Sequence, residues 1–159
     1  MADVHSPAQR SFNMSRIRGK DTAPEMRLRA LLHRAGHRFR LHRKDLPGRP
    51  DIVLPGSKIA VYVHGCYWHR HAGCRHSTMP SSNVDFWRSK FERTVERDQE
   101  NIEALKVAGW TPFIIWECEL RAEPEATLHR IQKAIGSSKQ QRHARHCKAL
   151  NDKELSARK

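Results

Sequence analysis

The sequence predicts an α/β domain in which helices flank a mixed sheet. Two features support this prediction: short β-branched runs bounded by proline and glycine, and longer amphipathic runs that end at glycine. The chain has 159 residues, of which 38% are hydrophobic. Two separate cores in a chain of this length would each bury too little apolar surface, so we expect one domain and one site.

The first predicted helix follows a polar segment. Residues 1–21 are basic and lack sustained periodicity, and we interpret them as an N-terminal arm. Thr22 and Glu25 then have the spacing of a capping box, and Gly36 is a typical stop signal. The apolar residues between these signals share one helical face: Leu28, Leu31, Leu32 and Ala35.

Two strands follow this helix. The runs "RPDIVLP" and "KIAVYVHG" are short, rich in β-branched residues and bounded by proline or glycine. The segment "LPGS" between them has the composition of a tight turn. We therefore expect an antiparallel hairpin.

A long helix and a third strand come next. Apolar residues recur at intervals of three, four or seven up to Gly109, which is the pattern of an amphipathic helix of several turns. These residues are Val84, Trp87, Phe91, Val95, Ile102 and Leu105. The run "PFIIWE" that follows predicts a buried strand.

The segment "PEATLHRIQKAIG" closes the domain as a helix with Leu128, Ile131 and Ile135 turned inward. The chain beyond it is polar and basic, so we expect a disordered tail. The predicted organisation is an arm, a folded domain over residues 22–136 and a tail over residues 137–159.

The charge of the chain indicates an anionic polymer as its partner. Lysine and arginine number 30 against 17 acidic residues, which gives a net charge of +13 and a pI near 10.3. Nucleic acid fits this balance. No apolar run approaches the roughly 20 residues of a membrane span, and the N-terminus lacks the apolar segment of a secretory signal. We expect a cytoplasmic protein with no membrane partner.

The cysteines indicate a structural zinc site. Thiols stay reduced in the cytoplasm, so metal binding explains four cysteines better than disulfides do. Cys66, His71 and Cys74 are spaced C-x4-H-x2-C directly after a strand, which brings three ligands together at little cost in chain entropy. Cys118, at the end of the third strand, is our candidate for the fourth ligand.

Three alternatives to this ligand set remain open. Cys147 could replace His71 in an all-cysteine site, although Cys147 belongs to the polar tail. His69 or His76 could also take the place of His71. Cys66, Cys74 and Cys118 are common to all of these sets.

An acidic residue and two histidines could form a nuclease site. Asp51 begins a strand, where a carboxylate can hold Mg²⁺ against a phosphate, and the next strand runs into His64. Histidines titrate near neutral pH, so His64 and His69 could serve the attacking water and the leaving oxygen. Glu25 could be carried to the same end of the sheet. The competing interpretations are a turn aspartate, structural histidines and a glutamate that only caps its helix.

Aromatic residues lie beside the same loop. Tyr67 and Trp68 stand between the candidate zinc ligands, and Trp87 begins the long helix. Bulky rings on a stiff loop of a basic protein suit insertion between bases, whereas Trp87 could equally pack in the core. Opening a base step costs a few kcal/mol and stacking returns about 1 to 3 kcal/mol, so insertion favours mispaired DNA.

Taken in order, these motifs resemble the very-short-patch repair (Vsr) DNA mismatch endonucleases. The match runs through "RSFNMSRIRGKDTAPE", "LPGRPD", "VHGCYWHRH", "FWRSKFERTVERD" and "GWTPFIIWECEL". The resemblance implies a restriction-endonuclease-like fold. It also implies a Mg²⁺-dependent endonuclease that nicks one strand 5′ of the T in T:G mismatches, which arise by deamination of 5-methylcytosine.

The resemblance implies a role for each catalytic candidate. Asp51 corresponds to the aspartate that binds Mg²⁺, and Val63 stands where a backbone carbonyl reaches the metal. A threonine often occupies this position, and valine keeps its carbonyl but loses its hydroxyl. His64 and His69 assist hydrolysis, with His69 as the base that activates water. Glu25 corresponds to the helix glutamate of the family.

The same resemblance assigns the zinc and DNA contacts. The structural zinc ligands correspond to Cys66, His71, Cys74 and Cys118. The intercalating aromatic residues correspond to Tyr67, Trp68 and Trp87. Further DNA contacts are expected from Met14, Ile17 and Lys90.

The implied substrate is double-stranded DNA with a T:G mismatch. A cytosine-5 DNA methyltransferase is the implied functional partner, and mismatch-repair proteins and a DNA polymerase would act downstream. We expect a monomer in the bacterial cytoplasm, associated with the nucleoid when bound to DNA. Two other functions remain open: a zinc-stabilised nucleic-acid-binding module without catalysis, and a sequence-specific restriction-type nuclease.

Overall fold

A computed structural model of the protein describes residues 6, 8–9, 12, 15–16 and 19–156, with only the backbone described for residues 141–156. Met14 and Ile17, both predicted DNA contacts, lie outside the described residues. Among the helices of the described part, none is long and apolar enough to cross a membrane.

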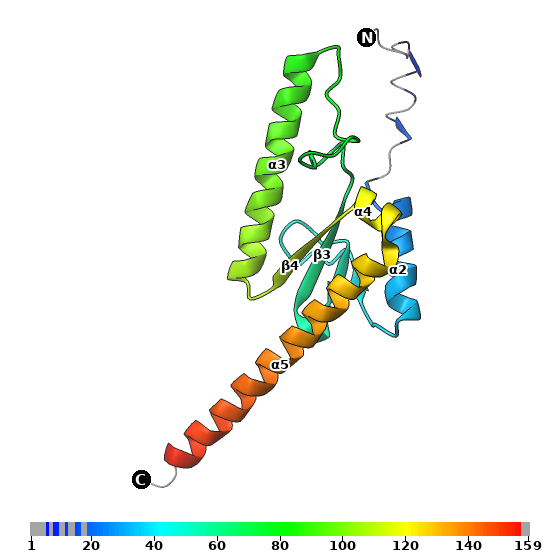
Figure 1. The fold of residues 1–159 in the computed structure, drawn as a ribbon. Coiled ribbons are helices and arrows are strands. Elements are labelled where there is room, and N and C mark those ends of the chain that lie inside the picture. Colours follow the sequence, from blue (N-terminus) through cyan, green and yellow to red (C-terminus); the bar gives the residue numbers. More distant parts are fainter. Residues whose placement is uncertain (1–5, 7, 10–11, 13–14, 17–18, 157–159) are drawn as a thin grey trace.

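A four-stranded mixed sheet forms the centre of the fold (Figure 1). Its strands, in order across the sheet, are β1 (Arg40–Leu41), β2 (Ile52–Leu54), β3 (Ile59–His64) and β4 (Thr111–Trp116). The pairs β1–β2 and β2–β3 are antiparallel, whereas β3 and β4 are parallel. The predicted hairpin and mixed sheet are therefore confirmed. Strand β1 was not predicted, because two residues show no periodicity.

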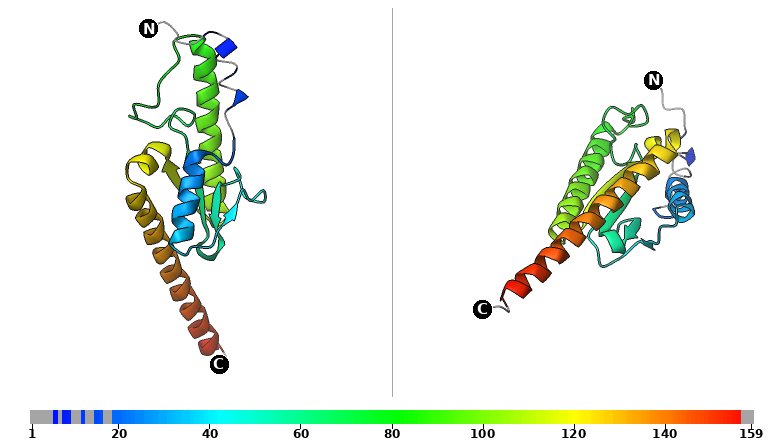
Figure 2. Two further views of the ribbon diagram at one scale, coloured as in Figure 1. Left: turned by 90° about the vertical axis from the view of Figure 1, so that its right-hand side faces the viewer. Right: turned by 60° about the horizontal axis from the view of Figure 1, so that its bottom comes forward.

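Helices flank the sheet on both faces (Figures 1 and 2). Helix α3 (Val84–Val107) covers one face, and α2 (Ala23–Arg34), α4 (Glu117–Ala122) and α5 (Pro124–Ser156) cover the other. The short helix α4 was not predicted, because "ECELRA" follows β4 without a turn residue between them. At its start, the Oε2 atom of Glu119 accepts a hydrogen bond from the backbone N–H of Trp116 at 3.5 Å.

Alternation along β3 divides the core into two clusters. Ile59 and Val61 point toward α2 and α5, where they pack against leucine and isoleucine side chains of both helices. Ala60 and Tyr62 point to the opposite face and pack with Leu105 of α3. His64 continues this second series, so β3 delivers it to the α3 side of the sheet.

Parts of α3 and β4 are less buried than the sequence predicts. Phe91 and Leu105 of α3 are buried, but Val95 is 44% exposed. The inward position between them belongs to Asp98, which is seven residues from each and faces a polar cleft. In β4 only Ile115 is buried, because this strand lies at the edge of the sheet.

Helix α5 is longer than predicted. Its expected inward residues pack on the core: Leu128, Ile131 and Ile135. The helix does not end at Gly136, however, and its backbone continues to Ser156, where we expected a disordered tail over residues 137–159. This segment contains no proline or glycine and many strong helix formers. Ser138 Oγ also donates a hydrogen bond to the carbonyl of Ser57 at 2.5 Å.

Candidate active site

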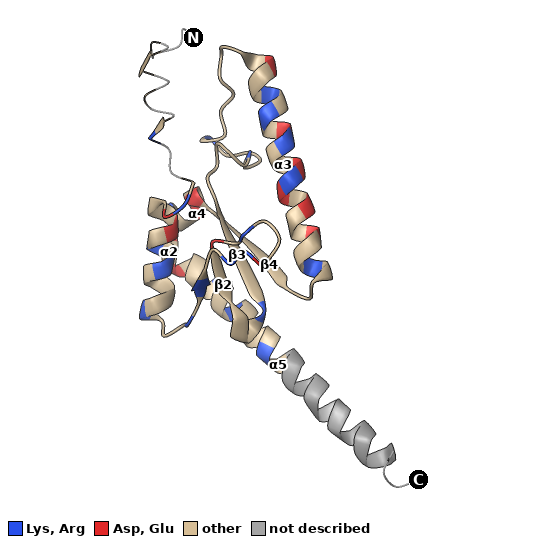
Figure 3. Ribbon diagram, turned by 180° about the vertical axis from the view of Figure 1, so that it is seen from behind, with Lys and Arg blue, Asp and Glu red and all other residues tan. Residues whose placement is uncertain are grey.

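A cleft of about 1450 Å³ opens where β2 begins and β3 ends. The first turn of α2 lies on one side of it, and α3, which carries several lysine and arginine residues, lies on the other (Figure 3). All four predicted catalytic side chains line this cleft: Glu25, Asp51, His64 and His69. Five cationic residues line it as well: Lys20, Lys44, Arg49, Lys90 and Arg97. Their charge suits a phosphate backbone.

Asp51 is tied to the end of β3 by its carboxylate. Its Oδ2 accepts a hydrogen bond from the backbone N–H of Val63 at 2.7 Å. Burial raises the pKa of Asp51 to about 6, although the hydrogen bond from Val63 acts in the opposite direction. A buried carboxylate that ionises with difficulty gains from a cation beside it, which is the behaviour of a metal ligand.

His64 and His69 stack on each other in the cleft. Their ring centroids are 3.8 Å apart and their planes are inclined by 10°. Burial, together with the smaller effect of the charge of His69, lowers the pKa of His64 to about 4. His64 is therefore neutral at physiological pH and does not titrate near neutrality as expected from the sequence.

Asp98 of α3 orients His69. Its Oδ2 lies 2.5 Å from Nδ1 of the His69 ring. Burial raises the pKa of Asp98, but the hydrogen bond and charge of His69 outweigh this effect and bring that pKa below its ordinary value. An ionised Asp98 holds Nδ1 of His69 protonated and leaves Nε2 free for proton transfer.

Glu25 caps its helix, as the sequence indicates. It also has a charged partner that the sequence does not indicate. Its Oε1 accepts hydrogen bonds from Oγ1 and from the backbone N–H of Thr22 at 2.8 and 3.3 Å, and the second of these is one half of a capping box. Its Oε2 lies 2.7 Å from Nη2 of Arg29, in an ion pair that leaves the Glu25 side chain 4% exposed. Its catalytic role stays a prediction.

Sequence reasoning missed Asp98 and His42 in this cleft. A signal for Asp98 is present in α3, because Lys90, Thr94 and Asn101 share its helical face and also line the cleft. His42 gives no comparable signal, because the strand that precedes it is too short to recognise.

A second cluster joins four residues whose ligand atoms lie within 4.8 Å of one another: Cys66, His71, Cys74 and Cys118. Nδ1 of His71 is 3.6 Å from Sγ of Cys66 and 3.3 Å from Sγ of Cys118. Zinc bonds of about 2.3 Å to sulfur and about 2.0 Å to nitrogen, at tetrahedral angles, place such atoms about 3.5 Å apart. The donor set and its spacing therefore fit zinc.

Parallel pairing of β3 with β4 brings this second cluster together. His64 pairs with Trp116, and Cys66 and Cys118 each follow two residues after these paired strand ends. Cys118 lies in the first turn of α4 and not at a strand end as predicted. The ring of His71 stacks on Trp116 with 4.1 Å between centroids. Of the open alternatives, His69 is engaged by Asp98 instead.

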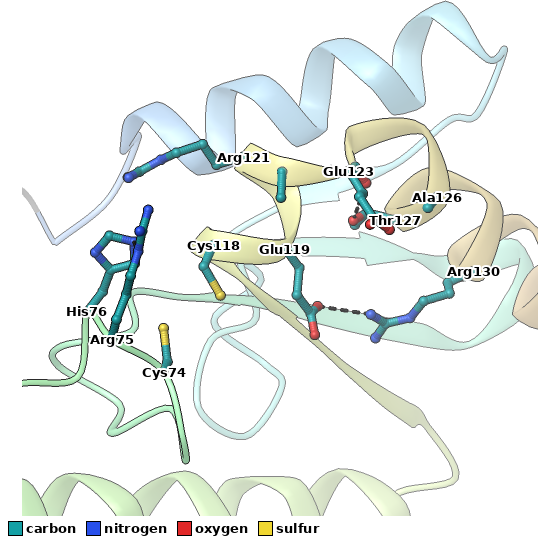
Figure 4. Close-up of a pocket in the computed structure, with 11 residues that line it drawn as sticks. Cys74, Arg75, His76, Cys118, Glu119, Arg121, Glu123, Ala126, Thr127 and Arg130 are labelled. Carbon is teal, nitrogen blue, oxygen red and sulfur yellow. Dashed lines mark hydrogen bonds and ion pairs between the residues drawn. The ribbon is translucent and has the colours of Figure 1, made fainter.

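A separate hollow of about 670 Å³ lies beside the Cys₃His cluster (Figure 4). The loop after β3, α4 and the start of α5 enclose it, with the sulfur atoms of Cys74 and Cys118 at one side. Glu119 forms an ion pair with Arg130 there at 2.9 Å, and His76 also lines the wall. The predicted catalytic residues all line the other cleft.

Aromatic side chains gather between the metal-binding loop and α3. Tyr67 meets Trp68 edge-on, with centroids 5.0 Å apart, and Trp68 lies 6.1 Å from Trp87. Nζ of Lys90 is 5.4 Å from the ring centre of Trp68 and 5.1 Å from that of Trp87. Trp87 is only 8% exposed and packs on Phe91, whereas Trp68 is partly exposed and lines the cleft. Trp87 therefore supports the group from the core.

Comparison with known proteins connects this site to a family. A family model described as DNA mismatch endonuclease Vsr matches residues 2–75. The type II nicking enzyme V.XorIIP of Xanthomonas oryzae is 49% identical over 120 residues, which cover 76% of this chain and 88% of that protein. The DNA mismatch endonuclease Vsr of Escherichia coli is 43% identical over 135 residues, covering 85% and 86%.

A solved structure shares the fold. The catalytic domain of the homing endonuclease I-Bth0305I superposes with a TM-score of 0.51 at 21% identity. The superposition covers 74% of this chain and 98% of that domain. The mixed sheet flanked by helices is thus the architecture of a known nuclease domain.

Proposed function

The chain belongs to the Vsr family of DNA mismatch endonucleases, and from this premise we propose that it nicks one strand of duplex DNA 5′ of the thymine in a T:G mismatch. The proposal includes Mg²⁺ as the catalytic ion and Zn²⁺ as the structural ion. The observation that carries it is the convergence of Asp51, His64 and His69 in one basic cleft.

The residues of the cleft fit a hard divalent cation. Asp51 offers a buried carboxylate whose ionisation a cation would restore, and the backbone carbonyl of Val63 would be a second oxygen ligand. When bound, Mg²⁺ supplies charge that stabilises the phosphate in its transition state. Valine in place of threonine leaves this backbone ligand available. Glu25 already forms an ion pair with Arg29, which offsets part of the charge that its carboxylate could offer to the ion.

The two histidines have different roles in the proposed reaction. His69 keeps a proton on Nδ1 for Asp98, so its Nε2 can accept a proton from the attacking water. His64 is neutral because burial lowers its pKa to about 4, and it offers an N–H donor to the phosphate. The stacked arrangement fixes the position of each ring relative to the other. Asp98 thus determines which nitrogen of His69 acts as the base.

The aromatic group supplies the preference for mispaired DNA. Tyr67 and Trp68 would enter the base stack, with Trp87 and Lys90 supporting them from α3. Stacking returns about 1 to 3 kcal/mol per base, which is comparable with the few kcal/mol needed to open a step. A mismatch opens at lower cost, so the net gain is larger there.

The wider setting follows from the same proposal. The relatives described as type II nicking enzymes support cleavage of one strand, and a link to a cytosine-5 DNA methyltransferase would explain the source of T:G mismatches. We propose that residues 1–21 contact DNA as an arm and that the protein acts as a monomer in the bacterial cytoplasm. Family membership removes the alternative of a module without catalysis. Double-strand cleavage of paired DNA remains an outcome of the test.

The test compares Asp51→Ala with the parent protein on a labelled T:G duplex. The variant should bind the duplex in a gel-shift assay but fail to nick it in Mg²⁺. Asp85→Ala, at an exposed carboxylate in the first turn of α3, is the matched control and should nick normally. Nicking by Asp51→Ala at the parent rate would overturn the assignment of Asp51. Equal cleavage of a paired duplex by the parent would overturn the mismatch specificity.

A further inference from the structure

His42 lies directly across the sheet edge from Asp51. In the antiparallel register of β1 and β2, Arg40 pairs with Val53 and Leu41 with Ile52, so the next position pairs His42 with Asp51. The chain leaves the strand at His42, which has a left-handed φ of 45°. The imidazole of His42, directly after strand β1, therefore lies beside Asp51, the candidate metal ligand.

The buried guanidinium of Arg29 holds the His42 ring from behind. Its Nη2 lies 2.9 Å from Nε2 of His42 and 2.7 Å from Oε2 of Glu25, and its Nη1 lies 2.6 Å from Oδ1 of Asp21. A guanidinium can only donate hydrogen bonds, so Nε2 of His42 must accept. The proton of a neutral His42 ring is then on Nδ1, which faces Oδ1 of Asp51 at 4.0 Å.

This arrangement excludes a metal ion among Asp21, Glu25 and His42, although their ligand atoms lie close enough to hold one. The cation in their midst is Arg29 itself, whose side chain is 10% exposed. Both carboxylates are paired with it. The cluster is better explained as a support for the neighbouring Asp51.

We propose that His42 is a positioning residue for Asp51, and that Arg29 sets the tautomer with which it acts. The two oxygens of Asp51 then have different partners. Oδ2 receives the N–H of Val63 at 2.7 Å, and Oδ1 is directed by Nδ1–H of His42. This inference rests on the proposed function, because it concerns how Asp51 is presented to Mg²⁺. An oriented second partner is what a metal-binding carboxylate commonly has.

Direct Mg²⁺ binding, measured by titration calorimetry on the zinc-loaded full chain, tests this role. His42→Ala should weaken Mg²⁺ binding about tenfold, which is the lower end of the loss expected when a partner of a metal ligand is removed, because the contact to Asp51 is longer than a hydrogen bond. His42→Gln should restore binding, since the glutamine amide can accept from Arg29 with its oxygen and donate to Asp51 with its nitrogen. His33→Ala, an exposed histidine of α2 outside the cleft, is the matched control.

Nicking kinetics give the second readout. The Mg²⁺ concentration for half-maximal nicking of a T:G duplex should rise about tenfold in His42→Ala, while the rate at saturating Mg²⁺ stays close to that of the parent. A purely structural role would lower the fraction of active protein and leave the half-maximal concentration unchanged.

Asp51→Asn separates the two proposals. If it loses Mg²⁺ binding while His42→Ala keeps the parent affinity, the role of His42 is overturned and the proposed function stands. If Asp51→Asn binds Mg²⁺ as the parent does, the assignment of the metal to Asp51 is overturned, and the role of His42 is overturned with it. Failure of His42→Gln to recover any affinity lost in His42→Ala would overturn the assigned tautomer.

Discussion

Replacing Asp51 with asparagine is expected to stabilise the protein when Mg²⁺ is absent. Burial raises the pKa of this carboxyl to about 6 from an ordinary value of 3.8. An acid whose pKa is raised on folding opposes folding once it ionises, so the destabilisation is complete above pH 6 and vanishes below pH 3.8. Asparagine keeps an oxygen for the N–H of Val63 and carries no charge.

The size of the effect follows from the same two pKa values. At about 1.4 kcal/mol for each tenfold change in proton affinity, they correspond to about 3 kcal/mol at pH 8 and to roughly half of that at pH 5. The Asp51 side chain is 19% exposed, so solvent screens part of this energy and about 3 kcal/mol is an upper limit. Added Mg²⁺ should reduce the difference, because it stabilises only the parent.

Urea unfolding followed by tryptophan fluorescence measures this difference at pH 5 and pH 8. The buffer must be free of Mg²⁺ but also free of chelator, because a chelator would remove zinc as well. Asp85→Asn is the control, since its side chain is 96% exposed and its loss should change stability by only a few tenths of a kcal/mol. Equal stability of Asp51→Asn and the parent at pH 8 would refute the argument from burial.

Three further predictions concern the metal cluster, the base and the aromatic group. Cys118→Ser should lose the bound zinc, measured as zinc per chain, and undiminished zinc would contradict the ligand set. Asp98→Asn should slow nicking about 10²-fold without weakening duplex binding in a gel shift, and an unchanged rate would contradict its control of His69. Trp68→Ala should reduce the preference for a T:G duplex over a paired one by about 5- to 150-fold in competition binding, equivalent to about 1 to 3 kcal/mol. Equal preference would place Trp68 outside the recognition of the mismatch.

The long elements of the fold could be predicted because their signals are local. The capping box at Thr22 and Glu25 marks the start of α2, and the apolar spacing up to Gly109 marks α3. The signals fail for β1 and α4, which are too short for a period to appear. The apolar spacing also predicts that Val95 is buried, whereas it is exposed. In this part of α3 the inward face lines a polar cleft and not a core.

The candidate site could be predicted where its residues share one loop. His64, His69 and the aromatic side chains are interleaved with the metal ligands, so one motif contains most of them. Asp98 and His42 come from other elements, and only the packing of α3 and β1 against the hairpin brings them close. The ion pair of Glu25 with Arg29 could not be predicted either, because oppositely charged residues at i, i+4 are common on exposed helices.

Strand β3 has a consequence for how the chain can change in length. Its alternate residues face opposite sides of the sheet, so one residue inserted within Ile59–His64 would turn His64 from the cleft toward α2. The same insertion would break the pairing of His64 with Trp116 and so separate Cys66 from Cys118. Substitutions within β3 keep this register, but an inserted or deleted residue does not. Changes in length are therefore expected in loops such as 77–83, which are not paired with a strand.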